Sequence, residues 1–327
     1  MTLSLIVHKP SHPRPLTRAT NALRARARPH GSIVAALAVC AGLAAFAGPA
    51  KARQAPETCN PRLLGRIPGR AADAPTGSQF ASSVRALSGT ARDRLAAVQL
   101  LAGDVPGFLR HLVPVTLRGA AAGKPVSVTV CVLPDYLAIG SNADHLFVPL
   151  GLGPALEVAG RFDFVLPTPK LVDAIYAASA VKLDPQPLTP SDRMRSTAYV
   201  VYHTQLIDLQ RESRLAPLGV LTSGDKKDLV LSERLWRIPG RVAIYGWQRA
   251  WNRPIQPLST VHGARYADYS HGVRLVSRTV YVNGVAGRID NVLSDPALAP
   301  LLTREGPMPH LLERLSTLLR ALSSSSP

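Results

Sequence analysis

The chain has 327 residues, with 29 prolines, three cysteines, and 38 Lys and Arg against 21 Asp and Glu. Proline has about twice its usual share and is scattered along the chain, which excludes long coiled coils and helical arrays. Hydrophobic residues make up 46% of the chain, as in ordinary globular proteins, which excludes a mainly disordered one.

The first 52 residues have the pattern of a secretory signal. They contain seven Lys and Arg and no acidic residue, and an Ala-rich apolar run over residues 32–47 leads to the small-residue cleavage pattern Ala50-Lys51-Ala52. The run is shorter than the ~20 residues that a membrane-spanning helix needs. We therefore expect a signal peptide over residues 1–52, a periplasmic or secreted protein, and no transmembrane helix after cleavage. An uncleaved inner-membrane anchor is the alternative.

The charge that remains after residue 52 is smaller and unclustered. It consists of 26 Arg and 5 Lys against 21 acids, a net charge of +10. No run of five like charges occurs there, and aromatic residues make up only 5% of the chain, so platforms for stacking bases are few. We expect no nucleic-acid partner. A weak, non-specific attraction to an anionic envelope polymer fits this charge better.

Two cysteines remain after the predicted signal, Cys59 and Cys131. An even pair in an oxidising compartment predicts a disulfide bond, and two unpaired buried thiols are the alternative. Two cysteines offer little for a Cys-ligated zinc site or a cysteine nucleophile.

Helical and strand patterns are mixed along the rest of the chain. The apolar spacing typical of helices occurs over residues 92–101, 168–178, 197–212 and 308–322. In the third of these, Tyr199, Tyr202, Leu206 and Leu209 form an apolar stripe that His203 borders. In the last, we expect the leucine face to pack on the body of the protein.

Strand patterns fall in two blocks, one on each side of the central helical segments. They occur at 113–117, 126–132, 136–140, 146–148, 228–232, 241–245 and 272–282. This arrangement predicts an α+β fold with a largely antiparallel sheet. We expect an irregular lead-in over 53–76, one compact domain over 77–322, and a flexible tail over 323–327.

The strongest candidate for chemistry is the polar segment 261–274, which leads into a predicted strand. We expect His262 and His271 to act as acid/base groups or ligands, and Asp268 to orient them. The three could instead hold zinc with one open position, although their spacing matches no zinc signature. In the third interpretation the two histidines only satisfy hydrogen bonds of the loop.

A Ser-His-Asp triad from Ser270, His271 and Asp268 is not expected. If the chain is extended from Tyr269 onward, Ser270 and His271 point to opposite faces, so the serine hydroxyl and the imidazole cannot form a hydrogen bond.

A second polar cluster, Ser223–Asp228, has two interpretations. Alternating charge at a turn is typical of a solvated hairpin tip. Alternatively the turn lies beside the histidine segment, where Lys227, Asp228 and Arg274 would contact the substrate.

Motifs of several enzyme classes are absent from the sequence. It contains no P-loop, no dinucleotide fingerprint, no H-E-x-x-H and no G-x-S-x-G, which argues against NTPases, Rossmann enzymes, common zinc peptidases and typical esterases. No cofactor is assigned from the sequence.

Three segments carry a resemblance to known proteins: 133–141, the Lys227-Asp228 turn, and 268–275. They resemble a group of secreted bacterial proteins to which we attach no activity. The resemblance covers most of residues 90–290. In that group histidine often stands where this chain has Asp225 and Gln248, which implies that a histidine-based site here is incomplete and weakens the interpretation as an enzyme.

Together these observations predict an exported protein of the bacterial envelope. We expect a hydrolase that acts on a cell-wall or extracellular glycan or peptide through a histidine-centred site. A non-catalytic envelope binding or interaction protein is the alternative. An enzyme should bring His262, His271 and Asp228 together in an accessible pocket, whereas a binding protein should leave them dispersed.

Overall fold

The computed structural model describes residues 56, 58–250 and 253–324. The predicted signal peptide, residues 1–52, lies outside the described residues, as do residues 325–327 of the predicted tail. The described part forms one compact α+β domain with mostly antiparallel sheets, as the sequence predicts. No helix in that part is long and apolar enough to cross a membrane.

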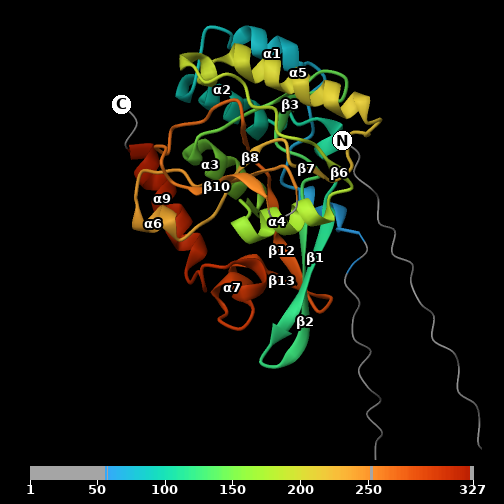
Figure 1. Ribbon diagram of the computed structural model, residues 1–327, viewed down its shortest axis with the longest axis vertical. Coiled ribbons are helices and arrows are strands. Elements are labelled where there is room, and N and C mark those ends of the chain that lie inside the picture. Colours follow the sequence, from blue (N-terminus) through green and yellow to red (C-terminus); the bar gives the residue numbers. More distant parts are fainter. Residues whose placement is uncertain (1–55, 57, 251–252, 325–327) are drawn as a thin grey trace, which may run out of the picture. The chain divides into compact units, whose positions relative to one another are not determined.

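The larger sheet is antiparallel and begins with a long hairpin. Its strand order is β1-β2-β12-β13, and β5 also pairs with β12. The strands are β1 (Val113–Ala121), β2 (Lys124–Val132), β5 (Phe164–Val165), β12 (Val276–Val282) and β13 (Val285–Arg288). Ala122 and Gly123 both have positive φ, which forms a tight two-residue turn that suits the twist of the hairpin. Both strands continue to this turn, beyond the predicted ends at residues 117 and 126, and the hairpin projects from the body of the domain (Figure 1).

The second sheet positions the predicted site. Its order is β10-β9-β8-β11, and β8 and β11 run parallel while the other pairs are antiparallel. The strands are β8 (Lys227–Leu229), β9 (Ile244–Gln248), β10 (Pro254–Ser259) and β11 (His271–Gly272). Two short pairs complete the strands, β3 (Ala138–Gly140) with β4 (His145–Phe147), and β6 (Val181–Lys182) with β7 (Thr222–Ser223).

Helices gather at the end of the domain opposite the tip of the β1–β2 hairpin and along one side (Figure 1). They are α1 (Gly77–Ser83), α2 (Thr90–Leu101), α3 (Leu152–Phe162), α4 (Pro169–Ala178), α5 (Thr197–Ser213), α6 (Arg234–Arg237), α7 (Ile289–Ser294), α8 (Ala299–Leu302) and α9 (Leu311–Ser324). The predicted helices correspond to α2, α4, α5 and α9. Leu311 and Leu318 of α9 are buried in the core, which confirms that its leucine face packs on the body.

Helix α5 buries a different face from its apolar stripe. Tyr202 and Leu209 are 51% and 60% exposed, whereas the inward residues include His203 and Arg211. His203 Nδ1 bonds with Lys226 Nζ at 3.0 Å, and the Arg211 guanidinium donates to Asp135 at 2.5 Å. Polar side chains with partners inside the fold can be buried, so the stripe does not identify the buried face.

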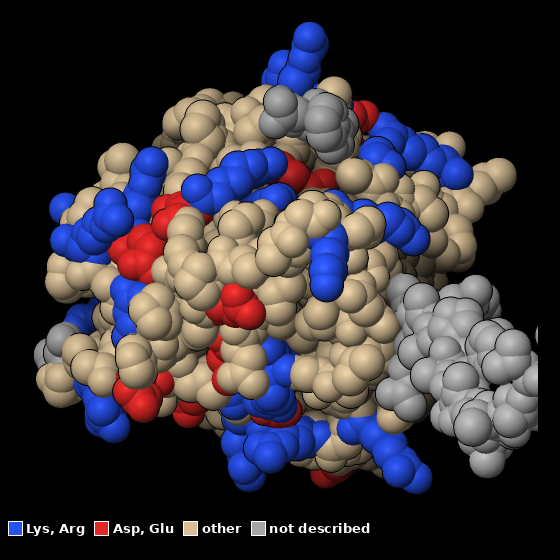
Figure 2. Space-filling model, turned by 90° about the horizontal axis from the view of Figure 1, so that it is seen from below, with Lys and Arg blue, Asp and Glu red and all other residues tan. Residues whose placement is uncertain are grey.

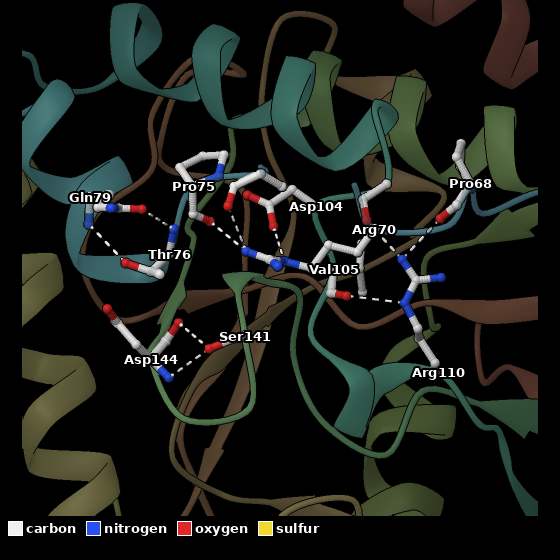
Figure 3. Close-up of polar contacts among 12 residues, drawn as sticks. Pro68, Arg70, Pro75, Thr76, Gln79, Asp104, Val105, Arg110, Ser141 and Asp144 are labelled. Atoms are coloured by element: carbon white, nitrogen blue, oxygen red, sulfur yellow. Dashed lines mark hydrogen bonds and ion pairs between the residues drawn. The ribbon is translucent and has the colours of Figure 1, made fainter. Parts of the chain in front are cut away.

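The segment before α1 is attached to the domain by arginines (Figure 3). Arg70 Nε donates to Asp104 at 2.8 Å and its Nη2 donates to Pro75 O at 3.0 Å, while Arg110 Nη2 donates to Pro68 O at 2.9 Å. Cys59 and Cys131 form the predicted disulfide bond, which fixes this segment to strand β2.

Candidate functional site

The predicted polar segment 261–274 is an irregular loop that leads into the two-residue strand β11. The strand begins only at His271, because Tyr269 and Ser270 lie in a turn in which the His271 N–H donates to Asp268 O at 3.0 Å. The expectation that the chain is extended from Tyr269 is therefore wrong. The turn brings the Asp268 carboxylate close enough to His271 for their charges to interact.

His271 is the buried centre of this segment. Its side chain is 1% exposed, and neither Nδ1 nor Nε2 has a hydrogen-bond partner among the described residues. Burial lowers the pKa of the imidazole below its ordinary value, against the opposing effect of the Asp268 charge, so the ring is neutral at pH 7. A buried polar group without a partner costs roughly 1–3 kcal/mol, so packing alone does not explain this histidine.

Asp268 is held as an ionised carboxylate. Its Oδ1 accepts from Ser270 N at 2.8 Å and from Ser270 Oγ at 2.5 Å, and its Oδ2 accepts from Tyr266 OH at 3.3 Å. Burial alone would raise the pKa of Asp268, but His271, Lys227 and the Ser270 hydrogen bonds lower it below its ordinary value. Because Ser270 donates to Asp268 rather than to His271, no Ser-His-Asp triad is assembled.

His262 and Tyr266 are half-buried and lie next to His271. Their rings stack at 4.0 Å with an interplanar angle of 9°, and the centroids of the His262 and His271 rings are 6.5 Å apart. Burial and the Asp268 charge raise the pKa of Tyr266 to about 12, so its hydroxyl stays protonated and donates to that carboxylate. Burial lowers the pKa of His262 below its ordinary value.

Lys227 completes the same side of the sheet. It pairs with His271 across β8 and β11, so the two side chains share one face. Its Nζ lies 4.7 Å from the centroid of the Trp247 ring, a cation–π contact. Trp247 has a φ of +57°, a conformation that is strained for a bulky residue, and such strain is concentrated at functional sites.

The turn Ser223–Asp228 lies inside the protein and is not a solvated hairpin tip. Every residue of it except Lys227 is buried. Lys226 Nζ donates to Tyr269 O at 2.9 Å and contacts His203, and burial lowers its pKa to about 8. The alternative interpretation, with this turn beside the histidine segment, is the one that the fold shows.

Asp228 and Arg274 belong to the opposite side of the β8–β11 pair. Arg274 donates to Leu133 O at 2.9 Å and to Thr222 O at 2.6 Å, and it lies over the Tyr136 ring. Asp228 Oδ2 accepts from Tyr136 OH at 3.0 Å. Both side chains are buried, and the strand register places Asp228 on the face opposite His271, so Asp228 does not join His262 and His271 in one accessible pocket. That these two residues contact a substrate stays a prediction.

Asp225 and Gln248 are also buried, with oxygen atoms that lack partners. Both carboxylate oxygens of Asp225 and Oε1 of Gln248 have no hydrogen-bond partner in the described part of the chain. Burial raises the pKa of Asp225 above its ordinary value. Sequence reasoning marked Gln248 only through the resemblance, whereas Asp225 also belongs to the predicted polar cluster Ser223–Asp228. It assigned no role to Tyr266 or Lys226, although both lie in the predicted polar segments, because their roles depend on contacts that the fold creates.

The donors for a metal ion do not converge at the predicted site. Among the described residues no group of three or more His, Cys, Asp or Glu side chains is placed to hold a metal ion. The zinc interpretation of His262, Asp268 and His271 therefore gains no support from this donor set. Comparison with family models, curated proteins and solved structures finds no match for the chain.

Proposed function

We propose that the protein is an exported bacterial hydrolase that acts on a cell-wall or extracellular glycan or peptide, with His271 as its general acid/base. The observation that carries the proposal is a fully buried imidazole whose two nitrogens lack partners, next to a fixed carboxylate. Such a ring has a donor and an acceptor available for a water molecule and a substrate.

The protonation states suit this role. A neutral His271 can take the proton of an attacking water and then give it to the leaving group of the cleaved bond. The ionised Asp268 makes no hydrogen bond to the ring, so it would stabilise the imidazolium that forms in between through its charge alone. His262, Tyr266 and Lys227 form the half-buried rim through which substrate would approach.

Two observations support an oxidising compartment and an envelope setting. Disulfide bonds such as Cys59–Cys131 are rare in reducing compartments, and the first 52 residues have the pattern of a secretory signal. Figure 2 shows Lys and Arg in several separate groups with acidic side chains near some of them, which suits weak attraction to an anionic polymer more than one specific basic track.

The test is hydrolysis of purified peptidoglycan by the parent protein and by His271→Gln. Release of reducing ends reports glycan cleavage, and release of free amino groups reports peptide cleavage. Loss of the acid/base group should lower the rate by about 10²–10⁴-fold. His310→Gln, at an exposed histidine of the C-terminal region, is the matched control and should keep the parent rate. Equal rates for parent and His271→Gln would contradict the proposal, and so would a parent with no activity on either bond type.

A further inference from the structure

A large cavity lies away from His271, at the end of the domain where α1 and α5 lie near the β3–β4 hairpin (Figure 1). Its volume is about 600 Å³, within the range of roughly 300–1,000 Å³ that is typical of small-molecule sites. Apolar walls come from Ala81, Leu146, Val201 and Leu218.

The charged groups of this cavity are mainly acidic, on a chain whose net charge is +17. Asp144, on the β3–β4 hairpin (Figure 3), Asp208 and Glu212 all line it. The one cation among the lining residues is Arg211, which is buried and paired with Asp135 at 2.5 Å. The cavity therefore has unbalanced negative charge.

Asp208 and Glu212 are placed to act together. They stand four residues apart on α5, so their side chains are neighbours on one helix face. Like charges at this spacing destabilise a helix, and a bound cation would remove that cost.

His145 gives an independent indication of a ligand. Its side chain is only 7% exposed and is held between the rings of Phe108 and Phe147, each at 5.0 Å. Its Nε2 faces Asp208 Oδ1 at 3.4 Å but has no hydrogen-bond partner among the residues that the structure describes. This unpaired nitrogen lies at the cavity wall beside Asp208, so a ligand held by Asp208 would be placed to supply its missing hydrogen bond.

We propose that this cavity binds a small compound that carries a primary ammonium group on an apolar body. The ammonium would lie between Asp208 and Glu212, and the body would contact the walls formed by Ala81, Leu146 and Val201. This site is separate from His271 and does not depend on the proposed hydrolase activity.

The experiment is calorimetric titration of the full chain with tryptamine and with tryptophol, its uncharged alcohol counterpart. Tryptamine should bind at least tenfold more tightly, since a hydrogen bond to a charged group is worth roughly 1.5–3 kcal/mol and each 1.4 kcal/mol is tenfold. Asp208→Asn and Glu212→Gln should each weaken tryptamine binding about tenfold and leave tryptophol binding unchanged. Glu313→Gln, at an exposed acid on α9, is the matched control and should change neither.

Val201→Trp separates the role of the cavity from the role of charge. It fills the space and keeps both carboxylates, so it should abolish binding of both compounds while the thermal midpoint shows a folded protein. Equal affinity for the two compounds would overturn the proposal. Unchanged tryptamine binding in the carboxylate variants, or no tryptamine binding at millimolar concentration, would also overturn it.

Discussion

The two sides of the β8–β11 strand pair both bury ionisable side chains, but they differ in how those groups are paired. On one side, Arg274 donates to two backbone carbonyls and Asp228 Oδ2 accepts from Tyr136, while Arg274 Nε and Asp228 Oδ1, 4.0 Å apart, have no hydrogen bond among the described residues. On the other, the His271 nitrogens have no partner within the described residues. Burial is similar on the two sides, and the difference is one of degree: Arg274 and Asp228 each keep hydrogen bonds, whereas the His271 ring makes none.

We expect the largest loss in the free energy of unfolding from Arg274→Met, and we compare it with the loss from His271→Leu. Arg274→Met leaves two buried backbone carbonyls without their charged donor, and an unpaired buried acceptor costs roughly 1–3 kcal/mol, so the free energy of unfolding should fall by about 3–5 kcal/mol. His271→Leu removes a buried group that has no partner, so the change should stay within about 1 kcal/mol. Urea unfolding at pH 7 measures both. A loss for His271→Leu as large as for Arg274→Met would show that His271 is structural.

The second prediction concerns the pH dependence of stability on the Asp228 side. Burial raises the pKa of Asp228 from 3.8 to about 7, although Arg274 opposes the shift. Between these values the folded state binds a proton that the unfolded state does not, so this residue's contribution to stability falls as pH rises from 4 to 7. Asp228→Asn cannot lose that proton. It should match the parent near pH 4 and exceed its unfolding free energy by roughly 2–4 kcal/mol above pH 7.

Unfolding free energies at a series of pH values test this prediction. Glu313→Gln, which changes an exposed acid, should follow the parent at every pH. His271 acts in the opposite direction, because its pKa is lowered and protonation favours the unfolded state as pH falls below 6.5. The contribution of Asp228 is therefore obtained from the difference in unfolding free energy between Asp228→Asn and the parent. A difference that does not grow with pH would contradict the predicted shift in the pKa of Asp228.

Local pattern in the sequence was enough to predict some of the elements, but it missed helices α1, α3 and α7, strands β10 and β13, and the polar interior. The β1–β2 hairpin and helices α2, α4 and α9 follow from apolar spacing and nearby turn residues. The buried turn Ser223–Asp228 does not, because its partners lie far away in the chain. Lys226 meets His203, and Asp228 meets Tyr136, which is 92 residues distant. A charged turn is solvated unless the fold supplies such partners, and only the fold shows that it does.

The candidate site was predictable in its residues and not in its geometry. The density of polar groups in 261–274 marks His262, Asp268 and His271 from the sequence alone. Whether Asp268 lies near His271 depends on the turn at Tyr269 and Ser270, which the strand pattern conceals. The cavity beside α5 could not be predicted from the sequence. Its acidic residues come from the β3–β4 hairpin and from one face of α5, and charged residues on a helix face are ordinarily solvated.

We expect the smallest changes in the free energy of unfolding from two tyrosine variants. Each tyrosine donates a hydrogen bond to an aspartate, one on each side of the β8–β11 strand pair. Tyr136→Phe leaves the buried Asp228 carboxylate without its hydrogen-bond donor, so unfolding at pH 7 should lose about 1–2 kcal/mol. Tyr266→Phe removes a longer contact of 3.3 Å from Asp268, which Ser270 still holds through two hydrogen bonds. Its cost should be below about 0.5 kcal/mol, and the proposed hydrolysis should slow, because the Asp268 carboxylate beside His271 loses one of its hydrogen-bond donors. If urea unfolding gives equal losses for the two variants, the Asp268 side is as much a part of the structural framework as the Asp228 side.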